Sequence, residues 1–231
     1  FATETHHRRD IPAGERVEYT DDQWAALEGL YDAEIRYTDR LLGRVIDRID
    51  DLPGETILIV TADHGDLFGE YGLTGHMHCL HDGLTHVPLV VSGADDALFT
   101  RQNGLVQHAD VMQTLLDLAD AATDQFQGVD LREGERDVAV SQRSPEVAAP
   151  AGFHLPMLTA LRTETHKYQR SDDGAELFRL PDETTDIAER EPDRKAKLDN
   201  KLSAFIAEHG EPVTETKEGR LTDDMEKQLR D

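Results

Sequence analysis

The chain has 231 residues, which is enough for one large domain or for a domain with a small companion, and 38% of its residues are hydrophobic. Its 48 acidic residues outnumber the 24 basic ones, so the formal charge is −24. Because so negative a surface repels phosphate backbones, the composition excludes nucleic acid as an expected partner.

The composition also indicates the kind of environment in which the protein works. Only 6 of its basic residues are lysine, and a carboxylate-rich surface with few lysines is typical of halophilic proteins, with an ordinary acidic protein as the alternative. The location stays unknown, although this composition favours the cytoplasm of a salt-loving microbe. The single cysteine, Cys79, excludes an internal disulfide, and no apolar run approaches the roughly 20 residues that cross a bilayer. The first residue is Phe1 rather than Met, which favours a piece of a longer protein, and a homo-oligomer stays open.

The first predicted element is a long helix that follows a polar, irregular segment over residues 1–19. Residues 20–23, Thr-Asp-Asp-Gln, form a capping box at its start, and Pro53-Gly54 marks its end. Apolar or small side chains then recur at steps of three and four: Trp24, Leu27, Tyr31, Ile35, Thr38, Leu42, Val45 and Ile49. We expect this stripe to face the core.

Two strands and a second helix follow the long helix. Residues 55–61 and 87–92 are short, β-branched apolar runs that predict buried strands. Residues 110–119 carry Val111, Leu115 and Leu118 on one helical face. This order of elements suggests a parallel sheet covered by helices.

The pattern changes near residue 136. Short alternating segments over residues 138–141, 157–163, 166–170 and 175–180 predict a small antiparallel sheet, with a hairpin turn at residues 171–174. A last helix is indicated by Leu198, Leu202, Phe205 and Ile206, and Gly210 is a plausible C-cap. We therefore divide the chain into a first α/β part over residues 1–135, a small antiparallel subdomain with a packing helix over 136–210, and a charged tail over 211–231.

The most informative stretch is residues 61–83, TADHGDLFGEYGLTGHMHCLHDG, which follows the first strand. Ligands bind beyond the carboxyl ends of strands in open α/β sheets, and Asp63 and His64 can offer a carboxylate and an imidazole to one cation there. The alternative is that Asp63 caps a turn and the histidines are scattered surface residues. No HExxH or CxxC spacing is present to decide between the two.

Several ordered blocks resemble the C-terminal half of the sulfatase family, in the alkaline phosphatase superfamily. They span residues ~25 to 208 and read ETILIVTADHGDLFGEYGL, HVPLVVSG, HADVMQTLLDLADA, HKYQ and AELFRLPDETTDIAE. The resemblance implies the C-terminal part of an alkaline-phosphatase-like parallel or mixed sheet flanked by helices. A small antiparallel sheet with a C-terminal helix completes the implied fold.

The resemblance also implies the site. Asp63 and His64 match a pair of family ligands that hold one divalent cation, usually calcium, with zinc or manganese left open by the histidine. His76 falls where many sulfatases place a lysine that grips a sulfate oxygen. It is expected to bind the anion when protonated, or else to ligate a second metal, and in both cases to share a cleft with Asp63 and His64.

The other candidates are expected to be structural. We interpret Cys79 as a small buried thiol, because the Cys/Ser-x-Pro-x-Arg surroundings of the family nucleophile are missing. Asp66 and Glu70 are expected to stay solvated. Four further histidines are expected in loops or at element ends: His78, His81, His86 and His108.

The function implied by the resemblance is metal-dependent hydrolysis of sulfate esters, on a sulfated small molecule or glycan. The family nucleophile, a Cys or Ser converted to formylglycine, would lie in an N-terminal half that this chain lacks, so the chain alone is expected to be inactive. One alternative is a phosphodiesterase, phosphonate hydrolase or phosphoglycerol transferase of the same superfamily. The other is a non-catalytic module that kept the fold.

Overall fold

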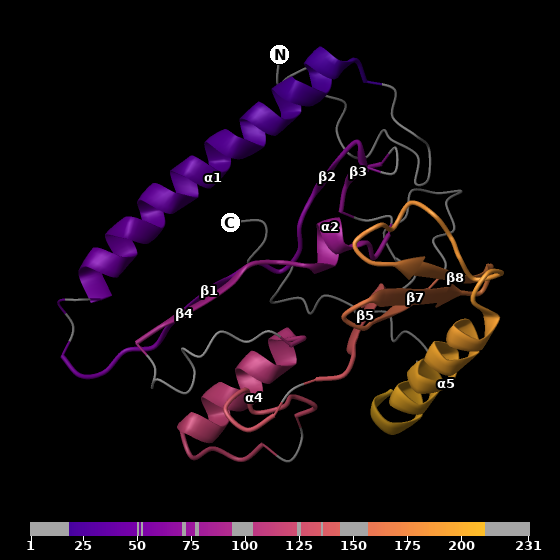
Figure 1. Cartoon of the computed structure of the whole chain (residues 1–231). Helices are drawn as coiled ribbons and strands as arrows, with labels where there is room; N and C mark the ends of the chain where they lie inside the picture. The colour runs from indigo at the N-terminus through magenta and orange to yellow at the C-terminus, as the bar shows by residue number, and fades with distance from the viewer. Residues whose placement is uncertain are drawn as a thin grey trace, which may run out of the picture.

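The computed structural model describes residues 19–49, 51, 53–70, 73–76, 79–93, 104–123, 126–134, 136–143 and 157–210. Its first element, α1 (Asp21–Ile49), is a long helix that stands apart from the other elements (Figure 1). The predicted capping box is confirmed, because Gln23 N–H donates to Thr20 Oγ1 at 3.3 Å and Thr20 N–H donates to Gln23 Oε1 at 2.9 Å. The tail over residues 211–231 lies outside the described residues.

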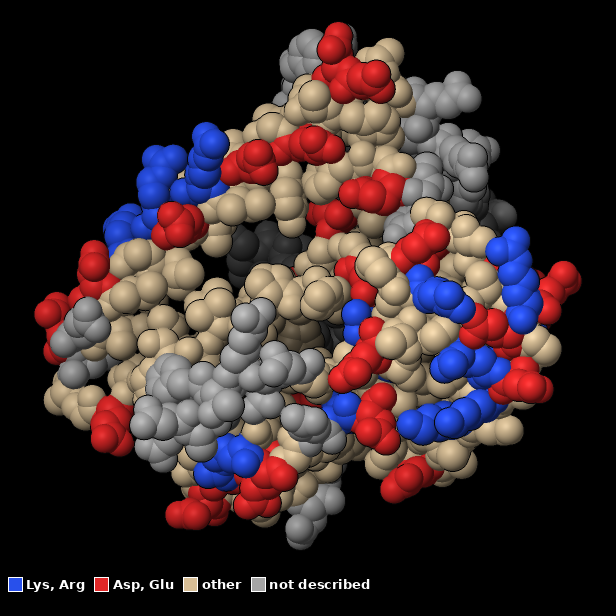
Figure 2. Space-filling model, in the orientation of Figure 1, with Lys and Arg blue, Asp and Glu red and all other residues tan. Residues whose placement is uncertain are grey.

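The apolar stripe of α1 does not face a core within the described part of the chain. No described residue of α1 is buried, and the stripe residues Tyr31, Ile35 and Val45 are 40%, 52% and 50% exposed. The helix touches the molecule mainly near its first half, where the Tyr31 and Phe68 rings lie 4.9 Å apart. Figure 2 shows a hollow between α1 and the rest of the molecule. The expectation was wrong because periodicity identifies an apolar face but not what covers it.

The first two long strands pair antiparallel. β1 (Leu58–Thr61) lies beside β4 (Leu89–Ser92), with Leu58 opposite Ser92 and Thr61 opposite Leu89. The parallel pairing that the element order suggested is therefore wrong for these two strands. The only described helix between them, α2 (Asp82–Thr85), has four residues and is too short to carry the chain back along the sheet. As a result, the chain leaves β1 after Thr61 and enters β4 at Leu89 at the same end of the pair.

The connection between β1 and β4 carries two short strands besides α2. β2 (Leu67–Phe68) pairs antiparallel with β3 (Thr74–Gly75). After β4, helix α4 (His108–Leu118) covers about the range predicted. Its buried Asp110 is bonded to Arg136 Nε at 2.6 Å and to Val129 N–H at 2.8 Å, which fastens α4 to the segment after it.

The C-terminal part forms the antiparallel sheet predicted from the sequence. Its strand order is β5-β6-β7-β8, with bounds Ala139–Arg143, Leu158–Arg162, His166–Ser171 and Gly174–Arg179. The hairpin is confirmed, since Ser171 lies opposite Gly174. Helix α5 (Pro192–His209) ends at Gly210, and its Leu198 and Leu202 join the main core with Leu161, Tyr168, Leu177 and Ala188.

The surface agrees with the acidic composition. Acidic side chains are spread over the visible face in Figure 2 and do not gather into one patch. Among the helices of the described residues, none combines the length and the apolar character that a bilayer crossing requires.

Candidate metal-binding site

The turn Asp63-His64-Gly65 directly follows β1, at the place where the sequence predicts a ligand. Asp63 Oδ1 accepts the His64 backbone N–H at 3.0 Å, and its side chain is 89% exposed. This backbone hydrogen bond is the largest cause of the lowered pKa of the Asp63 carboxyl. The carboxylate is therefore kept ionised at neutral pH and faces solvent.

His64 is oriented by its own neighbour. Its Nδ1 lies 2.8 Å from Gly65 O, and since a carbonyl oxygen only accepts, Nδ1–H is the donor. In the neutral ring this leaves the Nε2 lone pair free to bind, and Nε2 lies 3.7 Å from Asp63 Oδ2. A histidine that donates one ring N–H to a backbone carbonyl and offers the other nitrogen has the arrangement typical of metal ligands.

His76 lies against His64. Their rings stack with centroids 4.0 Å apart and planes inclined by 24°. His76 Nδ1 is 3.1 Å from Asp66 Oδ1, and both side chains are mostly buried. The expectation that Asp66 stays solvated was therefore wrong. The β2–β3 register explains the contact, because Leu67 opposite Gly75 places Asp66 next to His76.

Asp63 and His64 suit a divalent cation as part of its coordination shell. One ion bonded to both at about 2.0–2.6 Å allows the two donors to lie up to about 4–5 Å apart, and the observed separation falls within this range. Among the residues that the structure describes, no group of three or more His, Cys, Asp or Glu side chains could hold a metal. Because a divalent ion takes about four to eight ligands, this pair would supply only part of a site.

The turn rests directly on α2. Gly65 N–H donates to Leu84 O at 2.9 Å, and a Cβ added to Gly65 would lie closer than 3.0 Å to Gly83 O. Beneath this contact, Leu67, Cys79 and Leu84 form a small apolar cluster. The prediction of a small buried thiol is confirmed, and burial is the main cause of the raised pKa of Cys79.

A buried charge cluster holds the start of α2 to the C-terminal sheet. Lys167 Nζ lies 2.5 Å from Asp82 Oδ1, 2.7 Å from Glu183 Oε1 and 2.9 Å from Leu80 O. Arg162 also pairs with Asp82 at 3.0 Å. Burial raises the pKa of the Asp82 carboxyl, but the hydrogen bonds from Arg162 and Lys167 outweigh it and lower that pKa overall. No pattern in the sequence predicts this cluster, because its members come from separate segments of the chain.

His81 belongs to the same cluster. It is buried, and its Nδ1 is 3.5 Å from Glu183 Oε1, so it is a packed residue and not a surface loop histidine. His78 lies outside the described residues.

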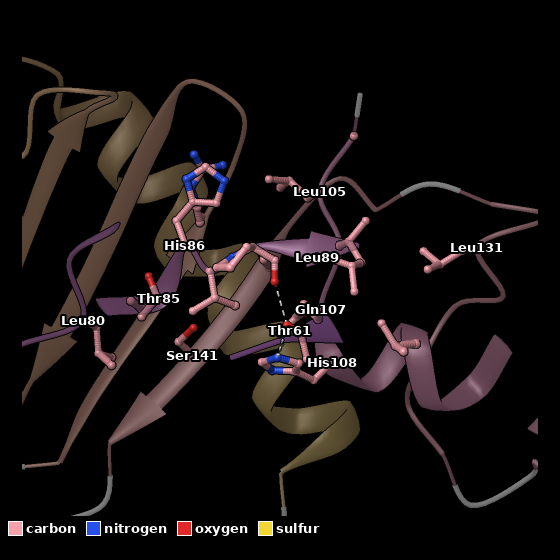
Figure 3. Close-up of a pocket in the computed structure, with 18 of the residues that line it drawn as sticks. Thr61, Leu80, Thr85, His86, Leu89, Leu105, Gln107, His108, Leu131 and Ser141 are labelled. Atoms are coloured by element: carbon pink, nitrogen blue, oxygen red, sulfur yellow. Dashed lines mark hydrogen bonds between the residues drawn. The ribbon is translucent and has the colours of Figure 1, made fainter. Parts of the chain in front are cut away.

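A separate cavity of about 710 Å³ lies beside the β1–β4 pair and is lined by His86 and His108 (Figure 3). Thr61 Oγ1 donates to Pro88 O at 2.8 Å, so it accepts from His108 Nε2 at 3.3 Å. His108 begins α4, as expected for an end residue, and also ties that helix to the end of β1.

Comparisons with known proteins give the family. The sulfatase profile matches residues 3–121. The chain is 30% identical to arylsulfatase K of Gallus gallus over 207 residues, which are 82% of this chain and 38% of that protein. It is 29% identical to arylsulfatase K of Homo sapiens over 206 residues, 81% of this chain and 38% of that protein. The chain thus spans less than two fifths of the length of these relatives.

Solved structures give the fold. A 2-O GAG sulfatase superposes with a TM-score of 0.70 at 19% identity, over 83% of this chain and 45% of that one. A phosphonate monoester hydrolase from Silicibacter pomeroyi superposes with a TM-score of 0.69 at 22% identity, over 90% of this chain and 47% of that one. The predicted fold class, α/β of the alkaline-phosphatase-like type, is confirmed. Because the sulfatase profile covers more than half of the 231 residues, the chain belongs to the sulfatase family.

Proposed function

We propose that this chain supplies part of the active site of a metal-dependent sulfuric ester hydrolase. The observation that carries the proposal is the joint placement of three side chains beyond the end of β1. Asp63 and His64 offer donors 3.7 Å apart, and the His76 ring stacks on His64. In a member of the sulfatase family, such a group suits a divalent cation and an anionic substrate.

Each residue has a distinct role in this proposal. Asp63 and His64 would hold the cation, with calcium the first expectation and zinc or manganese as alternatives. The cation would supply Lewis-acid stabilisation of negative charge on the ester oxygens. His76 would bind a substrate oxygen when protonated, and its contact with the Asp66 carboxylate at 3.1 Å orients the ring.

The rest of the active site is expected outside this chain. The family nucleophile, a formylglycine, and the remaining metal ligands would come from a preceding half of the same protein. Two observations support this: the chain spans 38% of the arylsulfatase K that it matches, and Leu30, Ile35 and Val45 of α1 are at least half exposed. The substrate class would be a sulfated small molecule or glycan.

Phosphate or phosphonate ester hydrolysis is the second candidate. It is favoured by the histidine at position 76, where the family resemblance implies a lysine for sulfate, and by the superposition on a phosphonate monoester hydrolase. A non-catalytic module that kept the fold is a third, and it predicts no turnover of either ester.

The test compares His76→Lys with His76→Gln in the protein that carries the complete chain. With an aryl sulfate as substrate, His76→Lys should retain part of kcat/KM, because lysine restores a cation. In His76→Gln, kcat/KM should fall about tenfold to a hundredfold, because one hydrogen bond to a charged group, worth about 1.5–3 kcal/mol, is lost. Equal loss in both variants, or a preference of the wild type for an aryl phosphate, would reject His76 as the sulfate-binding residue.

A further inference from the structure

The Asp63-His64-Gly65 turn is supported from behind by α2. The Gly65 N–H to Leu84 O bond of 2.9 Å and the close approach of Gly65 to Gly83 leave no side chain between the two backbones. The Gly65 carbonyl accepts the His64 Nδ1–H at 2.8 Å. The orientation of the His64 ring therefore depends on where α2 holds Gly65.

The position of α2 is fixed in turn by residues 80 to 101 positions later in the chain. Asp82, the first residue of α2, receives Lys167 and Arg162 on its carboxylate. Its backbone N–H donates to Glu183 Oε2 at 2.6 Å. The α2 helix is thus fastened at its first residue by both a side-chain and a backbone contact.

Lys167 and Glu183 are almost completely removed from solvent. Each side chain is 1% exposed, and Lys167 Nζ donates to Leu80 O and to Asp82 Oδ1 and forms an ion pair with Glu183 Oε1 at 2.7 Å. A buried ion pair is weak grounds for stability, because a well-packed apolar pair often stabilises as much. What the charges add is direction, since the two hydrogen bonds and the ion pair of Nζ specify where Leu80, Asp82 and Glu183 lie relative to the C-terminal sheet.

We propose that Lys167 and Glu183 are positioning residues for the Asp63–His64 pair. Through Asp82 and α2 they hold the Gly65 carbonyl where it fixes the His64 tautomer, with Nε2 directed to the metal side. This inference deepens the proposed function and rests on it in one respect, namely that Asp63 and His64 bind a metal. Every contact that links Lys167 to His64, through Asp82, α2 and Gly65, lies within this chain.

The test uses the full 231-residue chain with ¹⁵N label, without metal or substrate. Hydrogen exchange of the Gly65 amide reports the bond to Leu84, and the imidazole ¹⁵N shifts of His64 report its tautomer. Lys167→Met removes the charge and keeps the length of the side chain. Lys201→Met is the matched control, because Lys201 is 43% exposed and lies outside the cluster.

In Lys167→Met, Gly65 exchange should accelerate at least tenfold and the His64 Nδ1–H signal should weaken, whereas the Tyr168 amide in the central strand β7 keeps its protection. Lys201→Met should change neither signal. Because Lys167→Met removes the lysine partner of the buried Glu183 carboxylate and can unfold the chain, Glu183→Gln is the second variant, with a smaller change in the same direction. Unchanged Gly65 exchange, or equal acceleration of Gly65 and Tyr168 in both variants, overturns the proposal. Neither readout needs turnover, so a failed sulfatase assay and a failed positioning test are separate results.

Discussion

Replacing Gly65 by alanine is expected to dislodge the candidate metal-binding turn. The added Cβ would meet Gly83 O closer than 3.0 Å and the Gly83 carbonyl carbon at 3.2 Å. Both are backbone atoms, so no flexible side chain can move aside. The turn and α2 must separate until the contact reaches at least 3.4 Å, and the 2.9 Å bond from Gly65 to Leu84 is then stretched or lost.

The cost follows from two effects. Overpacking of this kind costs about 1–3 kcal/mol, and a lost internal hydrogen bond adds about 0.5–1.5 kcal/mol, so Gly65→Ala should destabilise by about 2–4 kcal/mol. The matched substitution is Gly29→Ala, because a Cβ there meets nothing within 4 Å and the site is inside α1. Gly29→Ala should instead stabilise the helix by about 0.5–1 kcal/mol.

Urea unfolding measures both variants with two probes. Far-UV circular dichroism follows the whole fold. Fluorescence of Trp24, the single tryptophan, follows the connection between β1 and β4, because Trp24 lies over Gly69. The Gly65→Ala midpoint should fall with both probes, and more with Trp24. A Gly65→Ala variant within 0.5 kcal/mol of wild type would show that the turn and α2 are not in rigid contact.

Four further predictions concern the isolated chain. With an aryl sulfate or aryl phosphate and added calcium, manganese or zinc, it should show no turnover; metal-dependent turnover that survives Cys79→Ala would refute the missing nucleophile. Calorimetry should find no tight calcium site, and a submicromolar one abolished by Asp63→Ala would contradict this. The melting temperature should rise with potassium chloride, since the Debye length shrinks from about 10 Å at 0.1 M to about 3 Å at 1 M; a flat or falling midpoint would remove the halophilic interpretation. Burial lowers the pKa of His166, so the unfolded chain binds more protons at this residue, and the free energy of unfolding should fall as the pH drops through about 6.5. His166→Gln should reduce this pH dependence of stability between pH 7 and 5. An unchanged dependence would exclude His166 as its source.

The sequence could predict what depends on neighbours along the chain. The capping box at Thr20, the hairpin at Ser171–Gly174 and the inward positions of α5 each need only a few adjacent residues. The Asp63–His64 turn was also found, because it follows a β-branched strand. Local signals of this kind are strong where backbone geometry and burial agree.

What could not be predicted depends on contacts between distant residues. The burial of Lys167 could not be inferred, since lysine is almost never buried unless it is paired, and its partner Glu183 comes from another segment of the chain. The Asp66–His76 contact required the register of two strands of two residues each. The direction of β4 relative to β1 depended on the path of the whole connection, which no periodicity encodes.

The antiparallel β1–β4 pair bears on how the protein tolerates changes in length. Thr61 lies opposite Leu89, so residues 62–88 leave and re-enter the sheet at adjacent positions. Closing a loop whose ends are already held together costs only about 0.6 kcal/mol more for each doubling of its length. Insertions at the tip, between Phe68 and Thr74, would therefore leave the sheet in register and the Gly65–Leu84 contact in place. A change in the length of the β2–β3 connection is thus expected to leave Asp63 and His64 in place at the end of β1.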